Sequence, residues 1–240
     1  MHNPSELVEG RPSVAVVVPR RTDNGPRDKL WEFIRQQWLT DHPGWPLVEG
    51  FHHDGPFNRA TAINRGANLA PPWDVLVIAD ADTLVPKDQA QAVAALAIDH
   101  GRLTLAYERY VSLTHQATQR LISGGPPLSG STVRWTMENS VSGCLAVPRV
   151  LWLAVGGFDE RFVGWGYEDR AFFVACDTLG GGHERVPGNV QHLWHPRPPE
   201  RSEQHPKFRA NRELCRRYKH AHGDRDAIRS ILAEREVTSA

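Results

Sequence analysis

Residues 74–82 read DVLVIADAD, an apolar run that passes directly into two aspartates. A short, continuous run of apolar residues rich in branched side chains is typical of a strand that is buried on both faces. Residues 13–19, SVAVVVP, form a second run of this kind, which proline ends. Because strands of this type occupy the centre of parallel sheets, these two stretches decide the fold class.

Outward from these two strands, the chain alternates between helix and strand patterns. The helix patterns cover 30–38, 57–70 and 86–100, and the strand patterns cover 47–53 and 103–107. This order predicts an α/β fold with an open, mixed but mostly parallel sheet that helices flank on both faces. Later in the chain we expect a strand over 140–147 and helices over 150–157, 167–179, 206–222 and 226–236.

The composition is that of an ordinary globular protein. The 240 residues include 23% charged and 40% hydrophobic residues, and 28 basic residues balance 28 acidic ones. A net charge of zero excludes a global field that attracts nucleic acid or an anionic membrane. The three cysteines are far apart with no CxxC spacing, which argues against a zinc site and favours a reducing compartment.

No stretch of the chain predicts a signal peptide or a membrane span. Residues 1–12 are polar, and no apolar run approaches the length of a transmembrane helix. We therefore expect a soluble, cytoplasmic protein. The sequence does not determine its oligomeric state.

The sharpest local signal is the acidic pair Asp80 and Asp82 at the end of a buried strand. Two carboxylates in this position are costly unless a cation neutralises them, and Mn²⁺ or Mg²⁺ is the natural candidate. Alternate residues of an extended chain point to opposite sides, so we expect one aspartate to bind the metal directly and the other to reach a water, a ribose or the sugar. The alternative is a strand end with two solvated aspartates.

Residues 192–195, HLWH, place two imidazoles three residues apart before a proline-rich stretch. One of them could complete a metal site that the acidic pair begins. His195 is our first choice and His192 the second. The alternative is that both are structural histidines, which are common in a chain with 12 of them.

A glycine-rich turn precedes the predicted helix at 167–179. Gly164 and Gly166 flank Trp165, so the backbone can approach a ligand closely while the indole offers a flat face to a sugar ring. Glu168 and Asp169 open the helix, whose positive end helps to keep them ionised, and an ionised carboxylate there can take a proton from an alcohol. The alternative is that the two acids only complement the helix dipole and that Trp165 is core.

Several residues that follow the first two strands are candidates for binding a nucleotide. Arg59 could pair with a phosphate and Phe57 could stack on a nucleobase, although Phe57 also fits core packing. Arg20 and Arg21 could serve the same anion or be solvated. Because ligands of open α/β sheets bind beyond the carboxyl ends of the strands, we expect 19–21, 53–54 and 80–82 to meet at one edge.

Four motifs in this order resemble the nucleotide-sugar-dependent glycosyltransferases of the GT-A fold, particularly the β-1,4-galactosyltransferase group and related bacterial and phage enzymes. They are FNRATAINRGA at 57–67, IADAD at 78–82, GGFDERFVGWGYED at 156–169 and HLWH at 192–195. The likeness spans residues 14 to 195.

The resemblance implies a UDP-sugar site with a metal ion. Asp82 would be a direct Mn²⁺ ligand with Asp80 beside it, and the late histidine would be the other protein ligand. The uracil and the diphosphate would be held at Phe57 and Arg59. The start of the nucleotide pocket would be Pro19 with Arg20, and Asp54 is similar in placement to an acid that contacts the nucleoside.

On the acceptor side, Trp165 and Glu168 match a sugar- and acceptor-binding motif, and Asp169 takes the position of the catalytic base. The implied reaction is an inverting transfer of a hexose (galactose, glucose or an N-acetylhexosamine) from a UDP-sugar to a hydroxyl of a glycan, a protein or a small molecule. The host compartment would be the cytoplasm of a bacterium or of a phage-infected bacterium. Arg170 departs from the animal enzymes, which continue acidic there, and the chain lacks their membrane anchor.

The resemblance also implies a division of one domain, residues 1–240, into parts. These are a nucleotide-sugar-binding half at 13–107, a mobile loop region at 108–135, an acceptor half at 136–196 and a C-terminal helical extension at 197–240. The loop region contains GGPPLSGS and little periodicity, and it could close over the donor.

Two other functions remain open at the level of sequence. A DNA-modifying glycosyltransferase that acts on a hydroxylated base would use the basic residues of the last helices, Arg209, Arg212, Arg216, Arg217 and Lys219. Helical spacing spreads these side chains around the axis, so a solvated surface is the favoured reading of them. A non-catalytic module that binds nucleotide sugars or carbohydrates is the other alternative.

Overall fold

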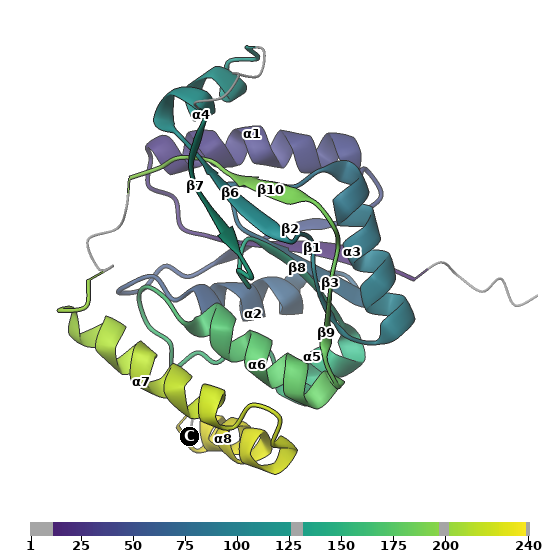
Figure 1. Cartoon of the computed structure of the whole chain (residues 1–240), viewed down its shortest axis with the longest axis vertical. Coiled ribbons are helices and arrows are strands. Elements are labelled where there is room, and N and C mark those ends of the chain that lie inside the picture. Colours follow the sequence, from purple (N-terminus) through teal and green to yellow (C-terminus); the bar gives the residue numbers. More distant parts are fainter. Residues whose placement is uncertain (1–11, 126–131, 197–201, 239–240) are drawn as a thin grey trace, which may run out of the picture.

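The computed structural model describes residues 12–125, 132–196 and 202–238. Its centre is a six-stranded sheet with the order β2-β1-β3-β8-β5-β9 (Figure 1). The strands are β1 (Val14–Arg20), β2 (Leu47–Phe51), β3 (Val75–Ala79), β5 (Leu103–Leu105), β8 (Cys144–Pro148) and β9 (His183–Arg185).

The central sheet is mixed and mostly parallel, as predicted. β1 pairs in parallel with both β2 and β3, and β5 pairs in parallel with β9. Only β8 runs antiparallel to its neighbours β3 and β5. The two apolar runs that decide the fold class, 13–19 and 74–82, therefore lie side by side in the middle of this sheet.

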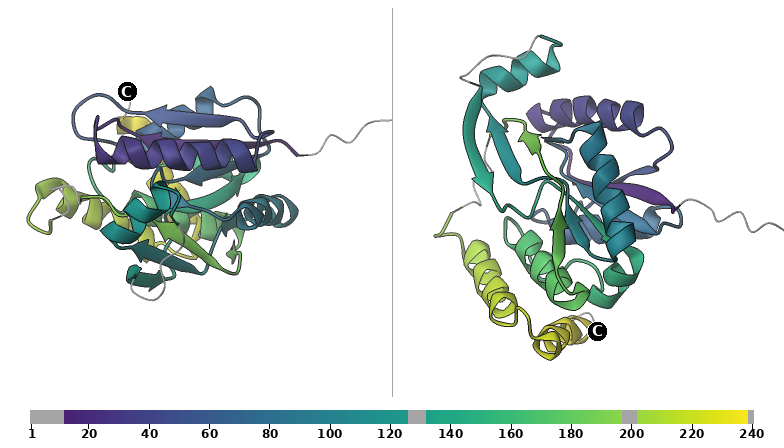
Figure 2. Two further views of the ribbon diagram at one scale, coloured as in Figure 1. Left: turned by 90° about the horizontal axis from the view of Figure 1, so that it is seen from above. Right: turned by 45° about the vertical axis from the view of Figure 1, so that its right-hand side comes forward.

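Helices cover both faces of the sheet because the central strands are apolar on both faces. On β1, Ala15 and Val17 belong to one core cluster, whereas Val16 and Val18 belong to the other. The first cluster is covered by α2 (Arg59–Leu69), α5 (Arg149–Val155) and α6 (Glu168–Gly180), and the second by α1 (Pro26–Asp41) and α3 (Lys87–His100) (Figure 2).

A second sheet, which the sequence analysis does not anticipate, has the order β4-β10-β6-β7. Its strands are β4 (Thr83–Leu84), β10 (Asn189–His192), β6 (Arg109–Leu113) and β7 (Val133–Glu138). β10 pairs antiparallel with β4 and in parallel with β6. The sheet thus connects the end of the DVLVIADAD stretch to the segment just before HLWH.

The prediction of an irregular loop region at 108–135 is wrong for most of the described residues. β6, α4 (His115–Ile122) and the start of β7 lie there. Each element is too short to show a clear period in the sequence, and α4 begins at Thr114, whose hydroxyl accepts the N–H of Ala117 at 3.2 Å. Residues 126–131, which hold most of the GGPPLSGS stretch, lie outside the described residues, so the proposed closure over a donor stays a prediction.

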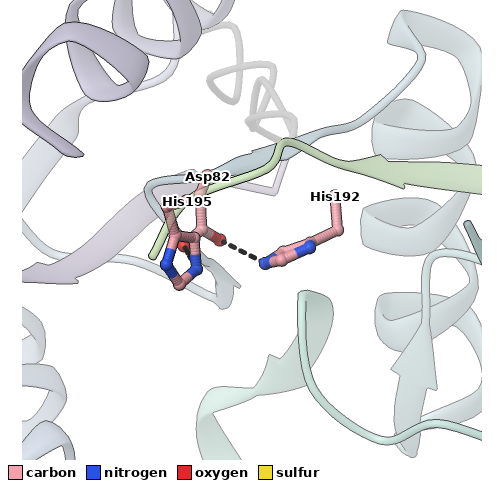
Figure 3. Close-up of side chains that lie close together, drawn as sticks. All are labelled: Asp82, His192 and His195. Atoms are coloured by element: carbon pink, nitrogen blue, oxygen red, sulfur yellow. Dashed lines mark ion pairs between the residues drawn. The ribbon is translucent and has the colours of Figure 1, made fainter. Parts of the chain in front are cut away.

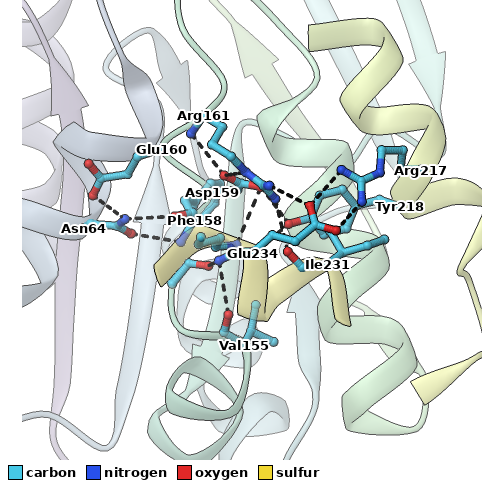
Figure 4. A network of polar contacts seen from close by, with 12 residues as sticks. Asn64, Val155, Phe158, Asp159, Glu160, Arg161, Arg217, Tyr218, Ile231 and Glu234 are labelled. Atoms are coloured by element: carbon cyan, nitrogen blue, oxygen red, sulfur yellow. Dashed lines mark hydrogen bonds and ion pairs between the residues drawn. The ribbon is translucent and has the colours of Figure 1, made fainter. Parts of the chain in front are cut away.

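The last two helices, α7 (Pro206–His220) and α8 (Arg225–Thr238), pack against α6 at the lower edge of the molecule in Figure 1. Cys215, Tyr218, Ile228 and Ile231 are buried in the same core cluster as α6. Figure 4 shows the polar contacts that fasten these helices to the turn around Asp159. Among the described helices, none has both the length and the apolar character needed to cross a membrane.

Candidate active site

Asp82, His192 and His195 converge where the two sheets meet (Figure 3). The antiparallel register of β10 and β4 places His192 opposite Thr83, and the N–H of Leu193 donates to the Asp82 carbonyl at 2.8 Å. One ligand atom from each of the three side chains lies within 4.8 Å of the others. Residues more than a hundred positions apart are therefore brought together by strand pairing.

The atoms that face one another in this group are suited to a divalent cation. The Nε2 atom of His195 lies 3.1 Å from one Asp82 oxygen, and the Nε2 atom of His192 lies 3.8 Å from the other. The Nδ1 atom of His195 is 2.7 Å from the Pro196 carbonyl, to which it can donate only if it carries the proton. That tautomer leaves the Nε2 lone pair directed at the site, as in many metal centres. Because Mg²⁺ prefers oxygen ligands, two imidazoles favour Mn²⁺ of the two predicted ions.

The protonation states of Asp82 and His192 are those that metal ligands need. Burial opposes ionisation of Asp82, but His192, His195 and Arg27 outweigh it and hold the pKa of this carboxyl below its usual range. Burial lowers the pKa of His192, so its ring is neutral at pH 7, as a ligand must be.

Arg27, in the first turn of α1, is a member of the site that the sequence analysis did not identify. Its Nη2 atom lies 3.3 Å from Nε2 of His195 and 3.9 Å from Asp82. The signal in the sequence was weak, since Arg27 is one basic residue in the polar turn before a helix. Arg27 is exposed beside the group of Asp82, His192 and His195.

Asp80 has different partners from Asp82. One of its oxygens accepts from Nη2 of Arg59 at 2.6 Å and from Nε of Arg59 at 3.1 Å, and the other accepts from the N–H of Gly143 at 3.1 Å. Asp80 lies outside the group that could hold a metal ion. The two aspartates point to different partners, as the alternation of an extended chain predicts, and a direct metal contact by Asp80 stays a prediction that this arrangement does not favour.

Arg59 joins the acidic pair to the start of α6. Its Nη1 atom lies 3.4 Å from a Glu168 oxygen, so Arg59 lies between Asp80 and Glu168. Burial and then the charge of Asp169 raise the pKa of Glu168 to about 7, although Arg59 opposes both. The sequence predicted a phosphate role for Arg59. In the described structure Arg59 already forms ion pairs with two carboxylates, and its binding of a phosphate stays a prediction.

The glycine-rich turn lies beside the start of α2. The N–H of Gly164 donates to the Phe57 carbonyl at 3.1 Å, and Asn58 forms an isolated bridge with Gly164. Gly166 has φ +96°, a left-handed conformation that glycine adopts without strain. Two of the motifs that carry the resemblance are thus in backbone contact.

Asp169 is half-buried in the first turn of α6. One of its oxygens accepts the backbone N–H of Arg170 at 2.7 Å. This contact is local to the helix start, and the part of the chain that the structure describes forms no ion pair with Asp169. Its role as general base stays a prediction.

Trp165 borders a cavity. Its ring stacks on Phe208 of α7 with the centroids 5.7 Å apart, and Tyr167 packs against the same ring at 5.1 Å. A cavity of ≈ 420 Å³ is lined by Trp165, Tyr167, Phe208 and Glu203. A binding role for Trp165 was predicted from the sequence, whereas Phe208 and Glu203 were not singled out, because an aromatic or acidic residue in the C-terminal region carries no distinctive signal.

The candidate nucleotide-binding residues fall into two groups. Arg20 pairs with Asp28 at 2.6 Å and with Glu49 at 2.8 Å, so acids of the protein already neutralise its charge. Pro19 precedes it within β1, opposite Gly50 of β2. These contacts explain the local structure of the strand end, and a nucleotide contact by either residue stays a prediction.

Arg21 is the more suitable candidate. Its Nε and Nη1 atoms donate to the carbonyls of His52 and Gly55, and its guanidinium lies 5.9 Å from the centroid of the Phe57 ring. Its buried Nη2 atom has no hydrogen-bond partner among the described residues. Asp54, which is exposed, lies in the same turn. Arg21 and Phe57 therefore meet just beyond the ends of β1 and β2, and a nucleotide contact by Arg21, Phe57 or Asp54 stays a prediction.

Comparisons with known proteins find a galactosyltransferase family model and similar structures of glycosyltransferases. A family model described as the N-terminal domain of galactosyltransferase matches residues 128–197, which is less than half of the chain. The structure of a mutant of Drosophila β-1,4-galactosyltransferase 7 with manganese, UDP-Gal and xylobiose aligns with a TM-score of 0.54 at 19% identity, over 84% of this chain and 80% of that one. The chain has the GT-A fold. The resemblance predicted from the four motifs is thereby confirmed at the level of fold.

Two further GT-A structures are similar. GalNAc-T7 with UDP, GalNAc and Mn²⁺ aligns with a TM-score of 0.52 at 14% identity, over 95% of this chain and 55% of that one. Glucosyl-3-phosphoglycerate synthase of Mycobacterium tuberculosis with Mn²⁺ and UDP-glucose aligns with a TM-score of 0.50 at 12% identity, over 88% and 79% of the two chains. A sequence search of curated proteins gives no significant match.

Proposed function

We propose that this protein is a metal-dependent, inverting glycosyltransferase that moves a hexose (galactose, glucose or an N-acetylhexosamine) from a UDP-sugar to an acceptor hydroxyl. The convergence of Asp82, His192 and His195 within a GT-A fold carries the proposal. The similar structures hold manganese with UDP, UDP-Gal or UDP-glucose, which supports the same class of donor here.

Asp82, His192 and His195 would hold the metal, Mn²⁺ in preference to Mg²⁺. When bound, the ion supplies positive charge that stabilises the departing diphosphate. Arg27, beside this group, would bind the same anion, and Arg21 with Phe57 would hold the nucleoside end of the donor. These residues would fix the donor with its anomeric carbon toward α6.

Asp169 would act as the general base. The acceptor oxygen attacks the anomeric carbon, the bond from that carbon to the diphosphate oxygen breaks, and the hydroxyl proton passes to the Asp169 carboxylate. Glu168 is less suited to this task, because it is buried and its carboxylate lies 3.4 Å from the Arg59 guanidinium.

The cavity lined by Trp165, Tyr167, Phe208 and Glu203 would receive the acceptor. Its aromatic side chains offer apolar faces to a sugar ring, and Glu203 offers a hydrogen-bond acceptor for hydroxyls. Glycans, proteins and small molecules that carry an exposed hydroxyl all fit this description. We also propose a cytoplasmic site of action, which the three buried, unpaired cysteines support.

A panel of UDP-sugars tests the proposal. With Mn²⁺, one donor should bind, measured by calorimetry, and should release UDP in the presence of acceptors. His195→Ala should weaken Mn²⁺-dependent UDP binding by at least tenfold. His222→Ala is the matched control, since His222 contacts Asp177 in a separate Asp–His cluster. Failure of every donor to bind with Mn²⁺, or an equal loss in the control variant, would overturn the assignment.

The surface of α7 gives little support to a DNA-modifying enzyme. Arg212, Arg216 and Arg217 form ion pairs with Glu203, Glu213 and Glu234. Their charges are therefore largely neutralised by the protein, whereas a nucleic-acid footprint needs free positive charge. A non-catalytic binding module is the other alternative, and UDP release that depends on Asp169 would exclude it.

A further inference from the structure

β7 is the outer strand of the second sheet, and its side chains are exposed. All of its residues except Trp135 are exposed, including the apolar side chains of Val133 at 45% and Met137 at 48%. In the part of the chain that the structure describes, β6 is its one strand neighbour (Figure 1). Proteins normally shorten or cover such an edge, because an unpaired edge is a template for another strand.

The register of β6 shows which backbone groups of β7 are directed outward. The N–H of Arg109 donates to the Gly188 carbonyl at 3.2 Å, so the backbone groups of Arg109 face β10. Arg109 lies opposite Glu138, and opposed residues of an antiparallel ladder alternate between pairs that are hydrogen-bonded to each other and pairs that are not. Glu138, and Thr136 two residues before it, therefore direct their N–H and C=O groups away from β6. No described strand lies on that side.

The charges of β7 are complementary to those of the same strand running in reverse. Arg134 and Glu138 are both exposed, and neither forms an ion pair with a described residue. They lie two residues before and after Thr136. If two antiparallel copies place Thr136 opposite Thr136, Arg134 of each copy lies opposite Glu138 of the other. Opposite charges in directly opposed positions stabilise a strand pair.

The same register covers the exposed apolar side chains. It places Met137 opposite Trp135 of the other copy, on the face of the sheet away from the two ion pairs. A thioether packs favourably against an aromatic ring, and the Trp135 ring already stacks on Tyr110 with the centroids 6.0 Å apart. A shift by two residues in either direction would lose the ion pairs and this contact together. One register therefore satisfies the backbone, the charges and the apolar side chains.

We propose that β7 is the interface of a symmetric dimer, in which two copies of this chain join their second sheets through antiparallel β7 strands. Thr136 lies at the twofold axis. Because the pairing joins identical edges, it closes at two copies and leaves neither β7 edge exposed. This inference does not depend on the proposed function.

The mass of the full-length protein in solution tests the dimer. Sedimentation equilibrium over a wide range of protein concentrations should give twice the mass of one chain. Arg134→Glu and Glu138→Arg should each raise the Kd of the dimer by about tenfold, since each turns two pairs of opposite charges into two pairs of like charges. The double variant restores both ion pairs with reversed polarity and should return the Kd to near the wild-type value.

A backbone variant tests the strand pairing itself. Thr136→Pro removes an N–H that points away from β6, so it should prevent dimerisation while the β6–β7 ladder stays intact. Thr136→Ala keeps that N–H and is the matched control, which should remain dimeric. Trp135 is left unchanged in every variant, because its ring lies 6.3 Å from that of His192. Circular dichroism and thermal unfolding check that each variant is folded.

Reversal of an exposed ion pair on α7 controls for the charge changes. Arg216→Glu and Glu213→Arg, singly and together, should leave the mass unchanged. A wild-type protein that is monomeric at every concentration would overturn the proposal. A dimer that persists in both single charge variants and in Thr136→Pro would use another surface, and the proposal would be wrong. A double variant no better than the single ones, or equal losses in the α7 variants, would also contradict it.

Discussion

At the scale of single residues, Glu168 is a buried acid that is only partly compensated. Arg59 lies 2.6 Å from Asp80 but 3.4 Å from Glu168, so it stabilises the Asp80 carboxylate more than the Glu168 carboxylate. Burial accordingly raises the pKa of Glu168 from about 4.5 to about 7. Between these two values the folded protein holds more protons than the unfolded chain, so this group makes the protein less stable as the pH rises through that window.

Glu168→Gln should remove this pH dependence. Between pH 5 and pH 8, the wild type should lose about 2–3 kcal/mol more free energy of unfolding than the variant, from about 1.4 kcal/mol for each pH unit of the window. Urea denaturation at the two pH values measures the difference. Glu32→Gln, an exposed acid of α1, is the control and should follow the wild type. Parallel curves for wild type and Glu168→Gln would show that Glu168 ionises normally.

Asp169 and Glu168 are neighbours with different predicted roles. Asp169→Asn keeps the size of the side chain but removes its ability to accept a proton. We expect kcat to fall by about two to four powers of ten, while the affinity for UDP with Mn²⁺ is unchanged. Steady-state UDP release and calorimetry measure the two quantities. Near-normal turnover in this variant would assign the base to another residue.

At the scale of elements, the buried carboxylate of Asp159 connects α7 and α8 to the rest of the molecule through hydrogen bonds and ion pairs (Figure 4). Asp159 is 3% exposed; Arg161 and Tyr218 each donate to one of its oxygens at 2.8 Å. Arg235 of α8 donates to the Tyr218 hydroxyl at 2.6 Å. Burial opposes ionisation of Asp159, but Arg161, Arg235 and Tyr218 outweigh it and lower its pKa.

Asp159→Ala should therefore destabilise the protein by about 3–5 kcal/mol, because it removes one partner of the ion pair that buried Asp159 forms with Arg161. Tyr218→Phe removes one hydrogen-bonding group and should cost about 1–2 kcal/mol. The midpoints of urea unfolding measure both effects. Arg216→Ala is the control, since its ion pair with Glu213 is exposed and should contribute less than about 1 kcal/mol. If Asp159→Ala lowered the free energy of unfolding as little as the control does, the contacts of Asp159 would not hold α7 and α8 in place.

The same comparison of elements shows what a single sequence can reveal. β1 and β3 were predictable because each is a run of buried apolar residues, and α2 because its apolar face repeats at helical spacing. β4 has two residues and β10 has four, which is too short for a period. Their pairing joins segments more than a hundred residues apart, and nothing local in the sequence encodes it.

For the site, the types of residue in the sequence identified the candidates, but their contacts with one another could not be predicted. Asp82, His192 and His195 were identified because carboxylates and imidazoles bind metals, and strand pairing does bring them together. The sequence could not show that Arg59 turns to Asp80, nor that Arg27 reaches His195 from α1. Both contacts depend on how helices dock on the sheet.

At the scale of the whole molecule, the candidate metal-binding group of Asp82, His192 and His195 joins two segments that lie far apart in the sequence. Asp82 follows the centre of the first sheet, whereas the histidines lie at and just beyond the end of β10 in the second sheet. A ligand that binds only when these sheets are assembled stabilises the folded state by mass action, with about 2.7 kcal/mol at a concentration of 100 times Kd. For a domain of this size that corresponds to a rise in Tm of roughly 5–10 °C.

Mn²⁺ should therefore raise Tm at pH 7.5, and Mg²⁺ at the same concentration should raise it less, because two of the three ligand atoms are imidazole nitrogens. At pH 5 protons compete with the metal for its ligand atoms more strongly than at pH 7.5, so the Mn²⁺ effect should be smaller. Thermal unfolding with and without each ion measures this directly. His195→Ala should lose the rise while His222→Ala, from the Asp177 cluster, retains it. A rise that survives in His195→Ala and is undiminished at pH 5 would place the stabilising ion elsewhere on the protein, and the group at Asp82 would then be an ion-paired structural junction between the two sheets.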